Sequence, residues 1–427
     1  MLTSIRTVAS LLLGTVLLLL GVGLLNTLIP LRGQSLGFSV SMVGALTSVY
    51  YVGYFIGTFT LPPLIHRIGH IRAFAFCTAL VAALVLVQAI SSAYWVWLVL
   101  RILQGLALVG LYAIIESWLN VAAEPKQRNA VFSVYMMLNL SALALAQQFL
   151  RIEGEAFVLF SVVAILICIA ILPVAATRQL QPQIQSIPKL KVRPLFRLVP
   201  TALTAALVSG LAMGALWGLL PLYARGIGFD SAEIGTYMSV AILGGVALQW
   251  PLGRLSDRHD RRIALALITA VASLIALAIL LLPGSSHALA MALVFAFGGM
   301  SFSVYPIAIA HLVDYLPREE LLSASSSVLL VNGVGSALGP LLAGALMNML
   351  QPWLLFAWFA ALYGLLAAYA TYRYATRRRE AVADRNYVPM IRTTPSALDL
   401  HPETRPDGET LLQPGADTEH GKRADLF

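Results

Sequence analysis

The chain alternates long apolar runs with short polar connections. Each long run has about the 20 residues that a helix needs to cross the hydrocarbon core of a bilayer. Backbone N–H and C=O groups find no water in that core, so each run predicts a transmembrane helix. The twelve predicted spans cover residues 8–30, 40–62, 72–92, 95–119, 129–150, 156–176, 200–224, 232–252, 262–283, 288–316, 322–349 and 352–375. The pattern therefore predicts an all-α integral membrane protein.

The composition supports this class. Of the 427 residues, 59% are hydrophobic and 11% are charged, and the mean hydropathy is +0.82. A soluble domain has about 25% charged residues, so a soluble enzyme or a secreted module is excluded. Cys77 and Cys168 both lie in apolar runs, and the histidines do not cluster with cysteines or acids. We therefore expect no disulfide, no metal site and no other cofactor.

The placement of Lys and Arg predicts the orientation. With the N-terminus in the cytoplasm, 24 of the 28 Lys and Arg residues fall on the cytoplasmic side and three fall outside. This asymmetry places both termini in the cytoplasm of a cell with the chain in its inner, or plasma, membrane. It also accounts for the net charge of +8 through lipid contacts, so we expect no nucleic-acid partner.

The connections divide the chain into four parts. Residues 1–176 form an N-terminal half of six spans, and residues 200–375 form a C-terminal half of six spans. A basic cytoplasmic linker, 177–199, separates the halves. The polar tail, 376–427, has no helical periodicity and is predicted to be disordered.

The two halves repeat each other. When the sequence is shifted by 191 residues, several identical residues of the two halves align without a gap. A shift of 193 residues aligns one further pair in a later span. The pairs are Pro30 with Pro221, Gly37-Phe38 with Gly228-Phe229, Gly44 with Gly235, Gly53 with Gly244, Arg67 with Arg258 and, at the changed offset, Asn139 with Asn332. Two parallel six-helix repeats are typical of transporters whose substrate path lies between the halves.

Several motifs carry a family resemblance. The segment from Gly253 to Arg262 resembles the signature loop of the major facilitator superfamily, with Asp260 in place of its usual second glycine. Arg101-Ile-Leu-Gln-Gly105 is similar to another element of the family. Other segments resemble its YcaD-like branch, namely Glu116-Ser117, Gly218 to Tyr223, and Gln249 to Leu255. The resemblance covers about residues 5–375 and implies a transporter with twelve transmembrane helices in two parallel repeats.

The resemblance also implies a cytoplasmic latch. Gly253 would allow close helix packing, and Asp257 would hold a helix end of the other half while the cytoplasmic gate is closed. Arg258 and Arg67 would pair with acids or lipid phosphates. An ordinary positive-inside loop is the alternative.

The first-half copy of the loop departs from the pattern. His66 stands where Asp257 would be expected, and Pro62 falls on Gly253. We therefore expect a lopsided latch. His66 and His70 either make it sensitive to pH or are simply solvated loop residues.

Two charges lie inside one span. Arg101 and Glu116 are 15 residues apart, which is about 22 Å along a helix, so they do not pair directly. Arg101 either attracts an anionic substrate or makes a helix-packing hydrogen bond. Glu116 either carries a proton or forms an ion pair with Arg128 or Arg72 at the cytoplasmic edge.

Other polar groups complete the set of candidates. His311 is a candidate for proton relay or for an interfacial polar cap. We expect Asn26, Asn139 and Trp217 to face a cavity, with interhelical packing as the alternative.

The function that fits best is a secondary transporter of a small solute that works by alternating access. Proton symport, proton antiport and facilitation all fit, and few charges within spans argue against multiply charged substrates. Gly335-x-x-x-Gly339-Pro340 resembles an antiporter element that belongs to span five of the family, and it favours export slightly. No Walker loop is present, so ATP does not drive transport. We expect a monomer in contact with membrane lipids.

Two other functions stay open. One is a transporter-derived sensor that signals through its tail, which deletion of 377–427 would separate from transport. The other is a membrane-embedded transferase. Such an enzyme needs acids or histidines clustered at one membrane face, and the sequence does not supply them, so we expect no enzyme.

Overall fold

The computed structural model describes residues 2–122, 128–176, 192–282, 286–316, 318–349 and 354–376. Most of the predicted linker, 177–191, and nearly all of the predicted disordered tail, 377–427, lie outside the described residues.

Helices account for all the regular structure of the described residues. They are α1 (Leu2–Ser35), α2 (Val40–Ile68), α3 (His70–Ile90), α4 (Tyr94–Ala122), α5 (Arg128–Ala146), η1 (Gln147–Arg151), α6 (Ala156–Ile169), α7 (Ile171–Ala175), α8 (Val192–Leu198), α9 (Pro200–Gly226), α10 (Ser231–Arg258), α11 (Arg261–Leu281), α12 (His287–Val313), α13 (Arg318–Met349) and α14 (Leu355–Thr376). Twelve spans are long and apolar enough to cross a membrane, with η1 continuing α5 and α7 continuing α6. The predicted all-helical, twelve-span fold is confirmed.

Several helices extend beyond their predicted ends, and α2 and α10 do so by six residues. We expected spans to end at residues 62 and 252, but α2 continues to Ile68 and α10 to Arg258. Charged residues end an apolar run but do not break a helix, so these helices continue past the apolar stretch. The signature segment was predicted to be a loop. This was wrong for most of its length, since only His259 and Asp260 connect α10 to α11.

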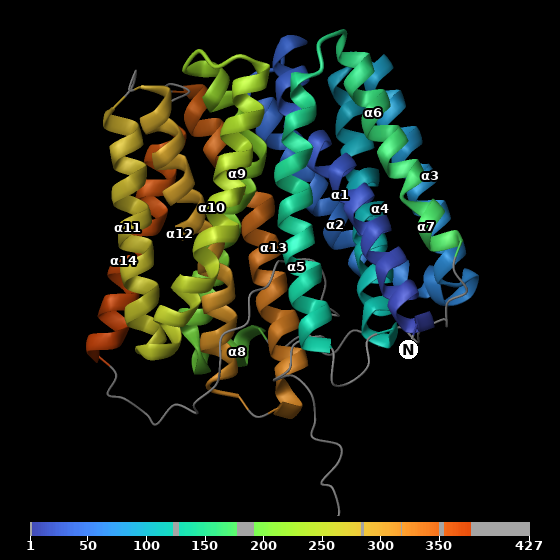
Figure 1. The fold of residues 1–427 in the computed structure, drawn as a ribbon. Helices are drawn as coiled ribbons and strands as arrows, with labels where there is room; N and C mark the ends of the chain where they lie inside the picture. The colour runs from blue at the N-terminus through green and yellow to red at the C-terminus, as the bar shows by residue number, and fades with distance from the viewer. Residues whose placement is uncertain are drawn as a thin grey trace, which may run out of the picture.

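The spans form two bundles that stand side by side. In Figure 1, α1 to α7 lie on one side and α9 to α12 and α14 on the other, with α5 and α13 near the middle. The described chain begins and ends on the same side of the molecule. We call this the inner side, because it is the predicted cytoplasmic side, and the opposite side the outer side.

The repeat is visible in matching turns. Gly37 follows α1 with φ 84°, and Gly228 follows α9 with φ 97°. This backbone conformation costs glycine little and other residues more. The next helix starts in the same way in both halves, because Ser39 caps α2 and Asp230 caps α10 through a side-chain oxygen.

Glycine seams repeat as well. Gly53 on α2 lies so close to α4 that an added Cβ would come within 2.0 Å of a carbonyl oxygen. Gly244 on α10 meets α12 in the same way, at 1.9 Å. The reciprocal glycines Gly105 and Gly298 each approach a carbonyl at 2.0 Å. Both halves thus join their second and fourth spans by the same backbone contact, which supports the two-repeat interpretation.

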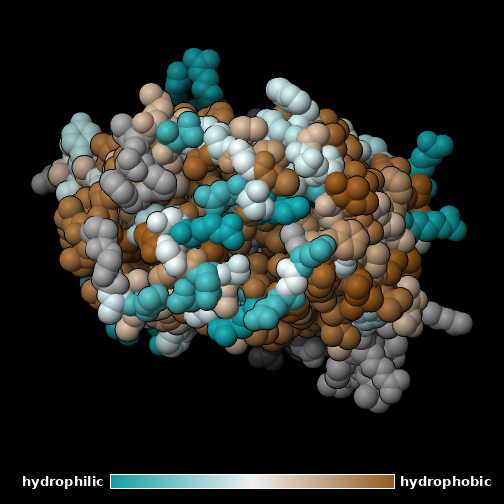
Figure 2. Space-filling model, turned by 90° about the horizontal axis from the view of Figure 1, so that it is seen from above, coloured by the Kyte–Doolittle hydropathy of each residue, from teal (hydrophilic) through white to brown (hydrophobic). Residues whose placement is uncertain are grey.

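The sides of the bundle are apolar. Figure 2 shows the outer face, where hydrophilic residues cross the middle and hydrophobic residues lie along the edges. Leu274 on α11 is 65% exposed and Leu365 on α14 is 70% exposed. Side chains of this kind on the outside of long helices suit contact with lipid. The chain is therefore a multi-pass membrane protein.

Candidate functional site

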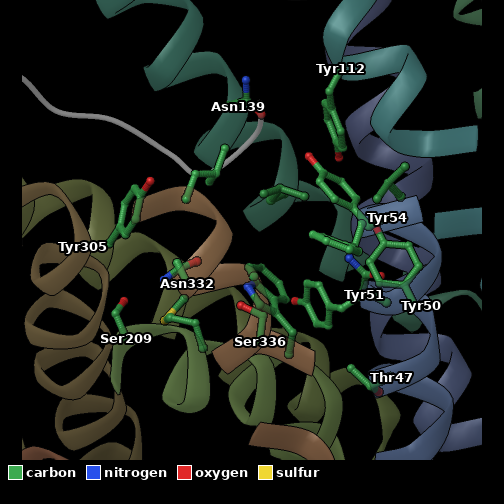
Figure 3. Close-up of a pocket in the computed structure, with 18 of the residues that line it drawn as sticks. Thr47, Tyr50, Tyr51, Tyr54, Tyr112, Asn139, Ser209, Tyr305, Asn332 and Ser336 are labelled. Atoms are coloured by element: carbon green, nitrogen blue, oxygen red, sulfur yellow. The ribbon is translucent and has the colours of Figure 1, made fainter. Parts of the chain in front are cut away.

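A cavity of about 240 Å³ lies between the two halves. Helices α1, α2, α4 and α5 line it from one side, and α9, α10, α12 and α13 from the other (Figure 3). Its polar or phenolic lining residues are Asn26, Thr47, Tyr50, Tyr51, Tyr54, Thr58, Arg101, Tyr112, Asn139, Ser209, Gln249, Ser301, Tyr305, Ser326, Asn332 and Ser336. Its place between two repeats is where a transporter binds its solute.

Tyrosines dominate the N-terminal wall. Tyr50, Tyr51 and Tyr54 come from α2 and Tyr112 from α4, and they gather on one side of the cavity in Figure 3. The ring centroids of Tyr50 and Tyr51 are 5.3 Å apart, and Tyr54 lies 6.4 Å from both Tyr50 and Tyr112. A spacing of three or four residues places Thr47, Tyr50/Tyr51, Tyr54 and Thr58 on one face of α2. These rings form a continuous aromatic surface.

Arg101 belongs to this wall. It is 2% exposed, and its guanidinium carbon lies 4.4 Å from the centroid of the Tyr50 ring. Its Nε donates to the carbonyl of Leu46 (3.4 Å), and its Nη1 donates to Oε1 of Gln104 (3.1 Å). Gln104 donates in turn to Gln88 at 2.8 Å. Arg101 therefore ties α4 to α2, as the helix-packing interpretation expects, and it also lines the cavity, while its attraction of an anionic substrate stays a prediction.

Glu116 lies behind the tyrosines. It is fully buried on α4 and is not among the lining residues. The hydroxyl of Tyr135 donates to Glu116 Oε1 at 3.4 Å. Glu116 also interacts electrostatically with Tyr54 and Tyr112, which do line the cavity. The alternative partner Arg128 is outside the described side chains.

The C-terminal wall is polar but uncharged in the part of the chain that the structure describes. The hydroxyls of Ser209 on α9 and Ser301 on α12 are buried, and no described group hydrogen-bonds to them. Asn332 on α13 donates to the carbonyl of Ala206 at 2.8 Å. This wall can offer hydroxyls and an amide to a solute.

The predicted cavity residues fall into two groups. Asn26, Arg101, Asn139 and Trp217 all line the cavity. His311 does not: it is buried at the inner end of α12, with its ring 5.1 Å from that of Tyr315. The structure therefore separates His311 from the other candidates, and its relay role stays a prediction.

Sequence reasoning missed several lining residues. Tyr51, Ser209, Ser301 and Ser326 were not singled out, because single hydroxyls are common in apolar spans. The helical spacing of polar residues on α2 was the available signal for Tyr51. No comparable signal marks the serines.

The halves contact each other at their outer ends. An added Cβ on Gly44 of α2 would lie 2.3 Å from the carbonyl oxygen of Pro340 on α13. Described hydrogen bonds across this end join Ser41 to the Gly344 carbonyl, Arg225 to the Leu31 carbonyl, Gln148 to Ser239, Ser239 to the Ala144 carbonyl, and Arg151 to Thr236. The outer side is closed.

The inner side is open. The lining extends into the inner parts of α2 and α10, at Phe59 and Gln249. Phe55 is 46% exposed and Phe59 43%, although both line the cavity. The structure is therefore inward-open.

The predicted latch residues lie at this inner end. Asp257 pairs with Arg261 at 3.0 Å, and Arg261 pairs also with Asp314, so these ion pairs stay inside the C-terminal half. Gly253 is buried, while Arg258 and Arg67 are exposed. A latch is expected to engage only when the inner side closes, so its role stays a prediction for this open structure.

The first-half histidines differ from each other. His66 is exposed, as expected for a solvated residue. His70 is only 3% exposed, and its Nε2 lies 3.3 Å from Oγ of Ser117. The interpretation of two solvated loop histidines is therefore wrong for His70, because α3 already begins there and turns the ring toward α4.

The antiporter-like element has a packing role. An added Cβ would lie 2.4 Å from the Leu207 carbonyl oxygen at Gly335, and 2.1 Å from that of Leu211 at Gly339. Both contacts join α13 to α9 within the C-terminal half. The glycines therefore explain close helix packing, whatever the direction of transport.

Comparison with known families decides the class. The family described as "Major Facilitator Superfamily" matches residues 11–304 and 202–393. This chain belongs to the Major Facilitator Superfamily. An uncharacterized MFS-type transporter YcaD of Salmonella newport (strain SL254) is 31% identical over 362 residues, covering 84% of this chain and 94% of the relative. The YcaD-type protein of Salmonella typhi is also 31% identical, over 359 residues.

Solved structures of the superfamily share the fold. The nucleoside transporter NupG superposes with a TM-score of 0.68 at 15% identity, covering 86% of this chain and 96% of that chain. A bacterial homolog of the human lysosomal transporter Spinster, in an inward-facing and occupied conformation, has a TM-score of 0.70 at 15% identity, covering 88% of this chain and 98% of that chain. These likenesses establish the superfamily fold.

Proposed function

We propose that this superfamily member is a secondary transporter that moves a small solute by alternating access, with proton coupling and in the direction of export. The observation that carries the proposal is the cavity between the repeated halves, which is closed outside and open inside. A rocking motion that closes the inner ends and separates the outer ends would present the same lining residues to the other side. The proposal includes no catalytic step.

Glu116 is the residue we propose for proton coupling. Its carboxyl is buried and accepts a hydrogen bond from Tyr135, and an ionisable group inside a span is a candidate for proton exchange. Tyr54 and Tyr112 interact electrostatically with Glu116 and also line the cavity. Their hydroxyls can both donate and accept, so they suit a proton path between solute and carboxyl.

The orientation completes the proposal. We place the inner side in the cytoplasm, with the chain as a monomer in the inner membrane. Exposed arginines at the inner ends of α2 and α10, among them Arg67, Arg254 and Arg258, support this placement.

The test is flux through the full chain in proteoliposomes. Wild-type protein is expected to accumulate or expel a solute when a pH gradient is applied, and to exchange labelled for unlabelled solute without one. Glu116→Gln should abolish the first and leave the second. The same substitution at Glu320, which is exposed at the inner end of α13, is the matched control. Gradient-driven flux that persists in Glu116→Gln would remove Glu116 as the coupling acid, and no flux of any solute would remove the transport proposal.

A further inference from the structure

We propose that the cavity selects a small, flat, aromatic-sized solute that carries a single negative charge. This inference rests on the proposed transport function and adds the chemical class of the solute. It is carried by the charge of the lining, by the aromatic wall and by the unpaired hydroxyls opposite.

Positive charge is the first observation. Among the described lining residues, Arg101 is the one member of the Lys, Arg, Asp and Glu group. Its described partners are neutral: a carbonyl, an amide oxygen and the ring of Tyr50. They hold the guanidinium in place but leave its charge uncancelled, and two hydrogen bonds use only part of its five N–H groups.

Glu116 does not neutralise this charge at the site. It lies 15 residues further along α4 and outside the lining, which places it about 22 Å away along the helix axis. A charge in an apolar wall acts more strongly on a solute than the same charge in water. The cavity therefore attracts an anion and repels a cation.

The aromatic wall is the second observation. Arg101 lies over Tyr50, at one end of the tyrosine surface that continues through Tyr54 to Tyr112. A flat ring can pack on this surface while its acidic substituent faces the guanidinium. Phenol hydroxyls can add hydrogen bonds to the same substituent.

The third observation comes from the opposite wall. Ser209 and Ser301 bring buried hydroxyls that no described group satisfies. Buried polar groups are usually hydrogen-bonded, and both residues line the cavity, so a rotation of either side chain would let its hydroxyl bond a polar substituent of the solute. In this proposal α2 and α4 bind the ring and its charge, whereas α9 and α12 bind a neutral hydroxyl or carbonyl group of the solute.

Size limits the class. The cavity holds about 240 Å³, whereas a cavity of roughly 150 Å³ accommodates benzene. One ring with substituents, or two small rings, fits this space. A single negative charge also agrees with export, because a membrane potential that is negative inside drives anions outward.

The experiment compares three para-substituted phenols of similar size and different charge, with acetate as a fourth probe that lacks the ring. Binding to the purified full chain is measured at pH 7 by thermal shift and by calorimetry, with 4-hydroxybenzoate, 4-hydroxybenzamide and 4-hydroxybenzylamine as probes. A ligand that binds the folded state raises the melting temperature. We expect the anion to bind at least about tenfold more tightly than the amide, since charge-assisted hydrogen bonds are the stronger ones. The amine should give no shift, and acetate, which has the charge without the ring, should bind far more weakly than the aromatic anion.

Variants identify the source of the preference. Arg101→Gln should bring the anion down to the affinity of the amide, while Arg101→Lys should keep the order of the three ligands. Arg197→Gln removes one exposed positive charge on α8 and should change nothing. If Arg101→Gln does not fold, the order of ligand affinities in the wild type and in Arg101→Lys still tests the proposal.

The outcomes are distinct. An amide that binds as well as the anion, or an anion preference that survives in Arg101→Gln, overturns the proposal. If the chain carries a neutral or cationic solute in proteoliposomes and ignores the aromatic anions, only this inference fails. If it carries nothing, the proposed transport function fails as well.

Discussion

At the scale of single residues, Asp260 shows how a departure from the family pattern is accommodated. Its φ is −57°, so the position does not need the usual glycine. One carboxylate oxygen accepts from the backbone N–H of Arg262 at 2.9 Å, and the two oxygens accept from its guanidinium at 3.0 and 2.7 Å. Burial raises the pKa of Asp260, but the hydrogen bonds and charge of Arg262 outweigh it, so the pKa is lowered.

Asp260→Asn should reduce stability at pH 7 by about 1 kcal/mol, because asparagine still caps the helix but loses the charge-assisted bonds. A lowered pKa in the folded state means that this contribution is complete above the unfolded value of about 3.9 and is lost as the pH falls through the folded pKa. Thermal unfolding at neutral and acid pH is the measurement. The gap between wild type and variant should narrow in acid, and a gap that widens there would contradict the assignment. Asp230→Asn, at a cap that lies outside the described ion pairs, is the control.

Some residues of the site could be predicted from the sequence, and others could not. Arg101 and Glu116 could be predicted because a charge in an apolar run is costly and therefore conspicuous. Ser209 and Ser301 could not, because a serine hydroxyl can bond to its own helix and costs little in a span. Only the packing of α9 and α12 shows that these two residues line the cavity and that no described group bonds to their hydroxyls.

At the scale of elements, the helices themselves could be predicted, whereas their contacts could not. Apolar length alone gave twelve spans, but α2 and α10 extend further because the end of an apolar run is not the end of a helix. Helix contacts depend on single atoms. Gly44 was visible only as a repeated glycine, and the structure shows that it seats α2 against Pro340 of α13.

Gly44→Leu should force the outer ends of α2 and α13 apart. An added Cβ would lie 2.3 Å from a carbonyl oxygen that cannot move without its helix. We expect solute exchange to fall to background. We also expect the cysteine introduced by Asn26→Cys to become accessible from the outer side. Labelling with a membrane-impermeant maleimide, in a Cys168→Ser background, measures this.

The control for that experiment is Gly364→Ala on α14, where the nearest atom to an added Cβ is the Ser273 hydroxyl at 3.2 Å. This variant should transport normally. Outside labelling of Gly44→Leu that stays at the wild-type level would show that Gly44 is not part of the outer closure.

At the scale of the whole molecule, the repeat could be predicted and the conformation could not. Matching glycines and prolines revealed the repeat in the sequence, because both halves need small residues at the same helix contacts. The side that is open depends on a free-energy difference of a few kcal/mol between two arrangements of the same sequence. No local pattern encodes so small a difference, and the ion pair between Asp257 and Arg261 became visible only in the folded chain.

Asp257→Asn should shift the population further toward the inward-open arrangement. When the inner side closes, α10 approaches the inner end of α5, which it already contacts elsewhere. A carboxylate at the end of α10 can then stabilise the start of that helix. Asparagine loses this charge, so a cysteine at Asn26→Cys should label faster from the inner side. Arg258→Gln, at an exposed neighbour on the same turn, shows how much a simple change of surface charge contributes. Equal labelling rates in wild type and Asp257→Asn would argue against the latch.

The chemistry of the outer closure has a consequence for the surroundings of the cell. None of the described bonds across the outer ends joins two opposite charges; they use hydroxyls, amides, backbone carbonyls and arginines bound to neutral groups. Salt screens attraction between charges and has little effect on bonds of this kind. We therefore expect the outer ends to close equally well at low and at high external salt, a concentration that the cell does not control. The Asp257–Arg261 ion pair, in contrast, lies at the inner side, which we propose to face the regulated salinity of the cytoplasm.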